Sequence, residues 1–225
     1  MSKHLKLQKL LKNNEIDAML VSNFSNIFYY SQFTGTNANL LIYEEHKYLI
    51  TDFRYEQQAK QLDNGYEVIT TDDDNTLIDV INKLKKQHKF SSLGLEGDTI
   101  TRNQWLAFER RLTARLNDIN LDCVRAVKDE EEVRLIKEAI RIAEKAFADT
   151  LEYMEVGMSE REVCRYLENK MLDYGAEKPS FTTIVASGHR GALPHGVAFD
   201  KIIENNELVT FDFGCKYKGY CSDIT

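Results

Sequence analysis

Two aspartates near the end of the chain are the residues best suited to carry chemistry. Residues 209–225 have the sequence VTFDFGCKYKGYCSDIT, in which Asp212 and Asp223 lie on two predicted strands around a turn. If Tyr217 and Lys218 form a two-residue loop between these strands, the two aspartates lie directly opposite each other. Opposed residues share one face of a strand pair, with Cβ atoms roughly 4.5–5.5 Å apart.

This closeness of two carboxylates predicts a metal site. Two such groups repel each other unless a cation lies between them, and a pair of metal ions roughly 3.5–4 Å apart would fit the gap. An alternative stays open, in which the aspartates only flank or cap a turn, because aspartate is depleted inside strands. Asp212 lies between Phe211 and Phe213, and a carboxylate buried there needs a partner. A bulge at Gly219 would also shift the register by one residue.

A histidine in a turn-like segment is the second candidate. Leu193–Gly196 has the sequence LPHG. Proline fixes the backbone and glycine permits close approach, so a loop of this kind presents His195 rigidly. Histidine is the side chain best suited to exchange a proton near neutral pH. The alternative is a turn in which His195 is merely exposed to solvent.

Other catalytic patterns are not supported. Residues 189–191 (HRG) and 212–214 (DFG) superficially match two kinase motifs, but glycine occupies the catalytic aspartate position and no glycine-rich loop precedes them. Ser187 lacks the G-x-S-x-G elbow of serine hydrolases. The four cysteines show no CxxC spacing, and reduced thiols in a cytoplasmic protein are therefore expected.

The first part of the chain alternates between helical and strand patterns, which predicts a mixed α/β layer domain. The charged segment 124–132 (VRAVKDEEE) changes this character, so we expect one domain over residues 1–124 and a second over 125–225. Strands are expected at 18–22, 39–43, 47–51, 66–70 and 92–96, and helices at 54–62, 75–87 and 102–115.

The second domain begins with helical patterns and ends with strands. A long helix is expected over 129–153, with acidic residues in its first turn, where the helix dipole favours them. Ser159 and Glu162 form a capping box that begins the next helix, and Gly175 is suited to end it in a left-handed cap. Strands are expected at 183–187, 208–214 and 219–225.

Composition limits the classes of partner. The chain has 29 Lys and Arg against 36 Asp and Glu, a net charge of −7, which argues against nucleic acid or an anionic membrane surface as the main partner. No stretch has the apolar length needed to span a bilayer. With 43% hydrophobic residues in 225, the chain can bury a substantial core in two small domains.

Taken in chain order, several segments resemble the Xaa-Pro aminopeptidase and prolidase family of pita-bread metallopeptidases. Residues 30–35 and 51–55 resemble signatures of the N-terminal domain, and residues 127–132 resemble the entry into the catalytic domain. Residues 193–196 resemble a substrate-binding histidine loop, and residues 209–214 and 219–225 resemble metal-ligand strands. The resemblance implies an α/β creatinase/prolidase-type N-terminal domain, with a mixed sheet and flanking helices, followed by an incomplete α+β pita-bread domain. The segments are 30–35 (YSQFTG), 51–55 (TDFRY), 127–132 (VKDEEE), 193–196 (LPHG), 209–214 (VTFDFG) and 219–225 (GYCSDIT).

The resemblance also implies an activity and the residues that carry it. Asp212 and Asp223 match two aspartates that hold two divalent metal ions, and oxygen ligands suit Mn²⁺, or Co²⁺ in vitro. His195 matches a histidine that contacts the substrate and stabilises the transition state. The implied reaction is hydrolysis of the bond between an N-terminal residue and a following proline, in small peptides, by a cytoplasmic homodimer.

The family completes its metal site with a histidine and two glutamates further along, whereas this sequence ends at Thr225. Two carboxylates alone should bind metal weakly, because affinity depends on ligand number and geometry. We therefore expect a C-terminally truncated chain with weak activity or none. The alternative is a non-catalytic homologue that acts as a dimerisation or partner-binding module.

Overall fold

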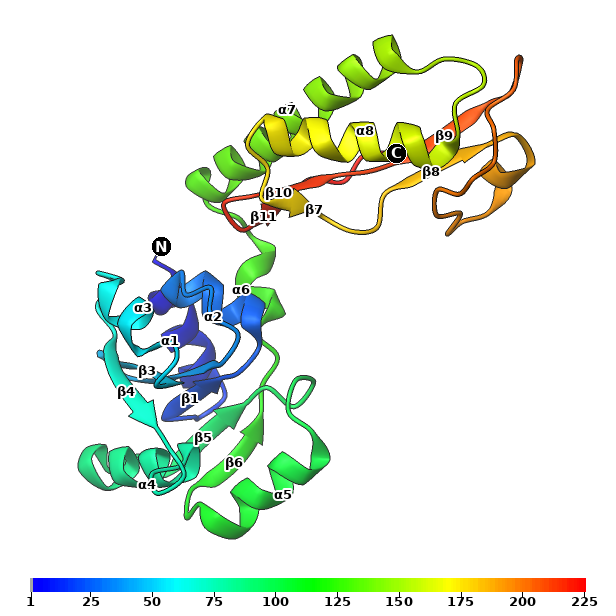
Figure 1. Ribbon diagram of the computed structural model, residues 1–225. Helices are drawn as coiled ribbons and strands as arrows, with labels where there is room; N and C mark the ends of the chain where they lie inside the picture. Colours follow the sequence, from blue (N-terminus) through cyan, green and yellow to red (C-terminus); the bar gives the residue numbers. More distant parts are fainter. Residues whose placement is uncertain (1) are drawn as a thin grey trace. The chain divides into compact units, whose positions relative to one another are not determined.

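The computed structural model describes residues 2–225 and divides into two compact units. Unit 1 ends at Val127, and unit 2 comprises Lys128–Thr225 (Figure 1).

Among the described residues of unit 1, six strands form one mixed sheet. Its order is β4-β3-β2-β1-β5-β6, and β2 runs antiparallel to both of its neighbours while the other pairs are parallel. The carboxyl ends of every strand except β2 therefore lie along one edge of the sheet. The strands are β1 (Ala18–Val21), β2 (Ala38–Tyr43), β3 (His46–Asp52), β4 (Glu67–Thr71), β5 (Ser92–Leu95) and β6 (Arg115–Asp118).

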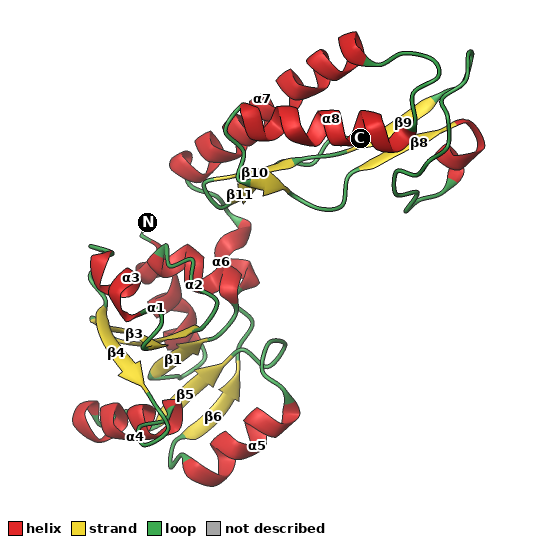
Figure 2. Ribbon diagram, viewed as in Figure 1, coloured by secondary structure: helices red, strands yellow, loops and turns green. Residues whose placement is uncertain are grey.

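Helices cover both faces of this sheet (Figure 2). Successive side chains of a strand point to opposite faces, and in β1 Met19 and Val21 join one apolar cluster while Ala18 and Leu20 join another. The first cluster includes residues of α1 (Lys3–Asn13), α2 (Phe24–Ser31), α3 (Glu56–Gln61) and α6 (Asp122–Ala126), and the second those of α4 (Leu77–His88) and α5 (Arg102–Arg111). The predicted α/β layer domain is thus confirmed.

Several elements of unit 1 differ from the sequence-based expectation. Helices α2 and α6 and strand β6 were not predicted, and the helix expected over 102–115 ends at Arg111. Leu112 is buried and follows Phe108 at helical spacing, but its backbone is already extended. Arg115–Asp118 then pair with Ser92–Leu95 as β6, so sheet pairing overrides the helical pattern.

Unit 2 packs helices against one side of short strands (Figure 2). Helix α7 (Glu130–Tyr153) packs against β10 (Cys215–Tyr217) and β11 (Tyr220–Cys221), and α8 (Glu160–Asp173) packs against β7 (Lys178–Pro179) and β8 (Ile184–Ser187). Strand β10 lies between β11 and β7, and β8 pairs with β9 (Val209–Asp212).

Local signals explain where these helices begin and end. Asp129 and Glu132 form a capping box at the start of α7, and the predicted box of Ser159 and Glu162 is present at the start of α8. Gly175 follows α8 with a φ of 97°, the left-handed conformation that glycine adopts without strain.

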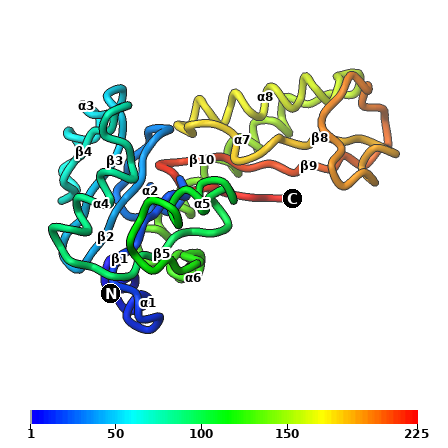
Figure 3. Tube along the Cα trace, turned by 90° about the horizontal axis from the view of Figure 1, so that it is seen from below, coloured from blue at the N-terminus to red at the C-terminus, as the bar shows by residue number. Residues whose placement is uncertain are grey.

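A long connection, residues 188–208, joins β8 to β9 and is drawn in orange in Figure 3. It begins with a 3₁₀ helix, Gly188–Ala192, and contains His195. Connections of this length inside a compact unit commonly carry function. Within residues 2–225, no helix combines the length and apolarity needed to cross a bilayer.

Candidate functional site

The hairpin that carries the two aspartates has a different register from the one expected. Strand β10 pairs Lys216 with Cys221 and Tyr217 with Tyr220. The loop is therefore Lys218–Gly219, and the expected loop of Tyr217 and Lys218 is wrong. Both loop residues have positive φ, 45° and 83°, as the tight type I′ turn requires, and glycine at the second position meets that requirement.

This register moves the aspartates from opposite to diagonal positions. The bridge between Phe213 and Ile224 continues the pairing, so Thr225 lies opposite Asp212 and its hydroxyl donates to Asp212 Oδ1 at 3.3 Å. Asp223 is therefore two residues away from the position opposite Asp212. A shift of two residues preserves the face of a strand, so the two residues still share one face, as diagonal neighbours, which in strand pairs are about 7–8 Å apart.

Gly214 lies in the hairpin segment between Asp212 and Asp223, where the partner backbone comes too close for any side chain. It follows Asp212 by two residues and lies opposite Asp223, on the same face of the hairpin. A Cβ atom at this position would lie 2.0 Å from the carbonyl oxygen of Ser222. Only glycine fits there without movement of the backbone.

The other face of the hairpin is anchored to the interior of unit 2. Phe213 and Cys215 are buried in the core, and the hydroxyl of Ser222 accepts a hydrogen bond from the Cys215 amide at 3.0 Å. At the hairpin end, the Tyr220 hydroxyl donates to Glu132 Oε1 of α7 at 2.9 Å. Because this face is fixed on the core, the opposite face presents its aspartates outward: Asp212 is half-buried and Asp223 is exposed.

His195 lies in a β-turn formed by Leu193–Gly196. The Gly196 amide donates to the Leu193 carbonyl at 3.1 Å. Proline at the second position and glycine at the fourth are typical of a type I turn. The His195 side chain is exposed.

Backbone pairing brings the histidine loop next to the strand of Asp212. Ile184 of β8 pairs with Asp212 on one side and with Val197, two residues after His195, on the other. Neighbouring strands lie about 4.8 Å apart, so the backbones of Val197 and Asp212 are roughly 10 Å apart across Ile184. The three predicted site residues thus occupy neighbouring segments of one unit.

A buried glutamate that the sequence did not single out organises the histidine loop. Glu160, the first residue of α8, is 0% exposed. Its Oε1 accepts from the amide and the hydroxyl of Ser187, at 2.7 and 3.0 Å. Its Oε2 accepts from Arg190 Nε at 3.0 Å and from the Phe199 amide at 3.2 Å.

These contacts set the protonation of Glu160. Burial raises the pKa of a carboxyl, but the hydrogen bonds from Ser187, Arg190 and Phe199 outweigh burial and hold the pKa of Glu160 below its ordinary value. The carboxylate therefore stays charged at neutral pH. In the sequence, Glu160 looked like one more acid in a helix first turn, so no signal marked it as buried.

A second polar contact closes the base of the loop. Lys201 Nζ donates to Glu207 Oε2 at 2.6 Å and to the Ser187 hydroxyl at 3.0 Å. Gly188, with a φ of 54°, leaves room for Glu207, because a Cβ there would lie 2.2 Å from Glu207 Oε1. Lys201 and Glu207 thus tie the end of the loop to its beginning.

The residues available for a metal are the two aspartates. Their donors are carboxylate oxygens, the ligand type preferred by hard divalent cations such as Mg²⁺, Ca²⁺ and Mn²⁺. The pair fits such an ion in chemistry and in sharing one open face. Within the part of the chain that the structure describes, no group of three or more His, Cys, Asp or Glu side chains is placed to enclose a metal ion.

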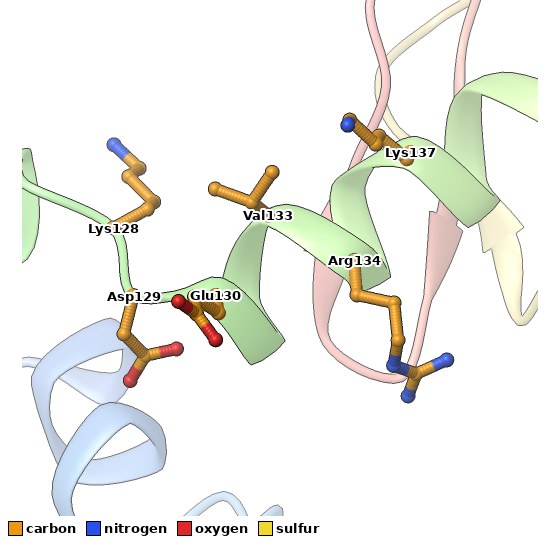
Figure 4. A pocket seen from close by; sticks show the side chains of 6 residues that line it. All are labelled: Lys128, Asp129, Glu130, Val133, Arg134 and Lys137. Atoms are coloured by element: carbon orange, nitrogen blue, oxygen red, sulfur yellow. The ribbon is translucent and has the colours of Figure 1, made fainter.

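A shallow pocket of about 400 Å³ lies elsewhere, at the start of α7 (Figure 4). Its side chains carry both signs of charge, and Arg134 is already paired with Glu131 at 2.6 Å. Asp212, Asp223 and His195 are not among the residues that line this pocket, so it is separate from the candidate site. It is lined by Lys128, Asp129, Glu130, Val133, Arg134 and Lys137.

Comparisons with known proteins match both units. Residues 3–136 match the creatinase/prolidase N-terminal domain, and residues 134–225 match metallopeptidase family M24. Among curated proteins, the chain is 39% identical over 223 residues to an uncharacterised peptidase, YqhT, of Bacillus subtilis. It is 34% identical over 236 residues to an Xaa-Pro dipeptidase of Pyrococcus furiosus.

Solved structures agree with this match. An Xaa-Pro dipeptidase from Bacillus anthracis superposes with a TM-score of 0.91 at 39% identity, and 98% of this chain covers 62% of that one. For the two curated relatives, 98% of this chain covers 63% and 62% of their lengths, so the chain spans less than two thirds of these proteins. The chain therefore belongs to the Xaa-Pro aminopeptidase and prolidase family, with a creatinase/prolidase N-terminal domain followed by part of an M24 metallopeptidase domain.

Proposed function

We propose that this chain is part of a metal-dependent peptidase that cleaves between an N-terminal residue and a following proline. The observation that carries the proposal is the placement of Asp212 and Asp223 on one open face of a hairpin, beside the loop of His195. Membership of a metallopeptidase family supports the class of reaction.

Each of the three residues has a distinct role. Asp212 and Asp223 would hold divalent metal ions. When bound, the ions supply Lewis-acid chemistry, which activates water and stabilises negative charge on the carbonyl oxygen. His195, exposed on its turn, would contact the substrate and donate a hydrogen bond to the developing charge.

The finer points of the proposal come from chemistry and from the similar proteins. Carboxylate ligands favour Mn²⁺ as the metal, with Co²⁺ able to replace it in vitro. Two of the similar proteins are named Xaa-Pro dipeptidases, which supports small peptides with proline in second position as substrates. We propose a cytoplasmic homodimer as the working form.

The test of the activity uses protein purified from its natural host, whose intact mass is measured first. We expect Mn²⁺-stimulated release of the first residue from an Xaa-Pro dipeptide and from a longer Xaa-Pro peptide. Matched peptides with alanine in place of proline serve as the control. If Xaa-Pro and Xaa-Ala peptides are cleaved equally, or neither is cleaved, the proposed specificity or activity is wrong.

The ligand assignment has a separate test on the 225-residue chain. Titration calorimetry with Mn²⁺ should show weak binding that Asp212→Asn and Asp223→Asn each abolish. Asp173→Asn removes an exposed carboxylate at the end of α8 and should leave binding unchanged. Equal binding by all three variants would contradict the assignment.

A further inference from the structure

We propose that Arg190 and Glu160 form a positioning pair that holds the loop of His195 against β8. In this arrangement a buried ion pair, and not the turn alone, sets where the histidine lies. The consequence for catalysis rests on the proposed function, whereas the structural part rests on contacts inside unit 2.

One guanidinium group connects the buried carboxylate to the histidine loop. Arg190 Nε donates to Glu160 Oε2 at 3.0 Å, and its Nη2 donates to the Val197 carbonyl at 2.7 Å. Val197 lies two residues after His195. The Arg190 side chain is 21% exposed and that of Glu160 is 0% exposed, so water competes little for the Arg190–Glu160 ion pair, whereas the Val197 end of the connection is exposed.

The hydrogen bonds inside the turn cannot replace this connection. The Gly196 amide donates to Leu193 and the Val197 amide to His195 itself. These bonds fix the shape of the turn, but they do not tie it to the rest of the unit. The bridge of Val197 to Ile184 and the Arg190 hydrogen bond tie the turn itself to the unit, and Phe199, two residues further on, is held by Glu160.

Both donor arms of arginine are needed for this role. Its planar fork presents several donors in fixed directions, whereas a lysine ammonium is a single point charge on a flexible stem. A lysine at position 190 would keep the charge beside Glu160 but would not also hold the Val197 carbonyl. Arg190→Lys therefore separates positioning from charge balance.

Arg161, the second residue of α8, provides a matched control that contacts the same loop. It pairs with Asp200 at 2.8 Å and lies over the Phe199 ring at 5.5 Å, close to the 5.6 Å of Arg190 from that ring. Its side chain is 39% exposed. Arg161 thus touches the loop from its solvent side without reaching the segment of His195.

Hydrogen exchange of the 225-residue chain tests the structural part. We expect Arg190→Lys to speed exchange of the Gly196 and Val197 amides about 10-fold or more, because an anchoring charged hydrogen bond is lost. The thermal unfolding midpoint should change little, and Arg161→Lys should leave both amides unchanged. Unchanged exchange in Arg190→Lys, or an equal effect of Arg161→Lys, would overturn the proposal.

A double-mutant cycle tests whether Arg190 acts through His195. In protein active on an Xaa-Pro peptide, Arg190→Lys should lower kcat about 10-fold with bound metal unchanged, and this effect should vanish in a His195→Ala background. Additive effects would show that Arg190 does not act through His195. The exchange measurement needs no activity, so loss of the proposed function and failure of this inference give different results.

Discussion

Glu96 in unit 1 and Glu160 in unit 2 are both removed from solvent, at 1% and 0% exposure. Glu96 accepts from the amides of Ser22 and Asn23 and from the Asn26 side chain. Glu160 also collects hydrogen bonds from two amides, but it has a cation as well, Arg190.

The pKa values of the two carboxyls move in opposite directions. For Glu96, burial dominates over the hydrogen bonds from Asn23, Ser22 and Asn26 and raises the pKa. For Glu160, burial also acts to raise the pKa, but the hydrogen bonds of Ser187, Arg190 and Phe199 prevail and lower it. Both units therefore contain a buried carboxylate. At Glu160 the hydrogen bonds of Ser187, followed by those of Arg190 and Phe199, keep the group charged as an anchor for the loop.

The largest expected effect is the contrast between Glu160→Gln and Glu96→Gln. An amide at position 160 would face obligatory donors at both oxygens and leave Arg190 without its carboxylate, so we expect unit 2 to lose about 3–5 kcal/mol of unfolding free energy. At position 96, the buried Asn26 Oδ1 lacks a partner among the described atoms. Asn26 can turn its amide and accept from the new amide, so the loss should stay below about 1 kcal/mol.

Urea unfolding measures this contrast unit by unit. The single tryptophan, Trp105, lies in α5 and reports unit 1 by fluorescence. Hydrogen exchange of α8 amides reports unit 2. Equal losses for the two variants would show that the arginine makes no energetic difference.

The two units can also be compared by the cost of adding a methyl group at a tightly packed glycine. A Cβ at Gly214 would meet the Ser222 carbonyl oxygen at 2.0 Å, whereas at Gly94 in unit 1 it would meet the Met19 sulfur at 2.7 Å. Backbone cannot move aside as a methionine side chain can. We expect Gly214→Ala to cost about 1–3 kcal/mol, the usual range for overpacking, and Gly94→Ala to cost less, with denaturant midpoints as the measurement. A larger loss at Gly94 would contradict this reasoning.

A smaller effect is expected from removing one hydroxyl in each unit. Tyr220→Phe deletes the hydrogen bond to Glu132, and Tyr66→Phe deletes the one between Tyr66 and His4, both 2.9 Å long. Each should cost about 0.5–1.5 kcal/mol in thermal or urea unfolding. Only Tyr220→Phe should also weaken Mn²⁺ binding, because Asp223 follows three residues later, just beyond the end of β11. If Tyr220→Phe leaves Mn²⁺ binding unchanged, the hydrogen bond from Tyr220 to Glu132 does not support the metal site.

The smallest expected effect is on the pH dependence of the free energy of unfolding, to which Glu96 and Glu160 should contribute in opposite directions. The pKa of Glu160 is lowered on folding, so its stabilising contribution is complete above the ordinary value of 4.5 and is lost as the pH falls through the lowered pKa. The pKa of Glu96 is raised, so its contribution improves as the pH falls through the raised value toward 4.5. Carboxyl ¹³C shifts should titrate with Glu96 at the higher pH, and the reverse order would refute the contrast.

Much of this fold could be predicted from sequence because its signals are local. The capping box of Ser159 and Glu162 and the left-handed Gly175 are short-range patterns with a physical cause, and the structure confirms them. Strand β6 could not be predicted, because Leu112 continues a helical spacing and only pairing with β5 shows where the helix stops.

The candidate site was predictable in its residue types but not in its geometry. Asp212 and Asp223 stood out because carboxylates are rare in strands, yet their relation depended on which two residues turn the hairpin. Glu160 gave no signal at all, because its burial depends on Ser187 and Phe199, which lie 27 and 39 residues later in the chain.

The start of α8 has a consequence for the order in which the chain folds. Most orphan amides of a helix first turn are satisfied locally, but here the Glu160 amide donates to the Lys201 carbonyl and the Arg161 amide to the Phe199 carbonyl. During synthesis α8 emerges from the ribosome well before those carbonyls do. These two amides of its first turn therefore find their protein partners only after the histidine loop has been made.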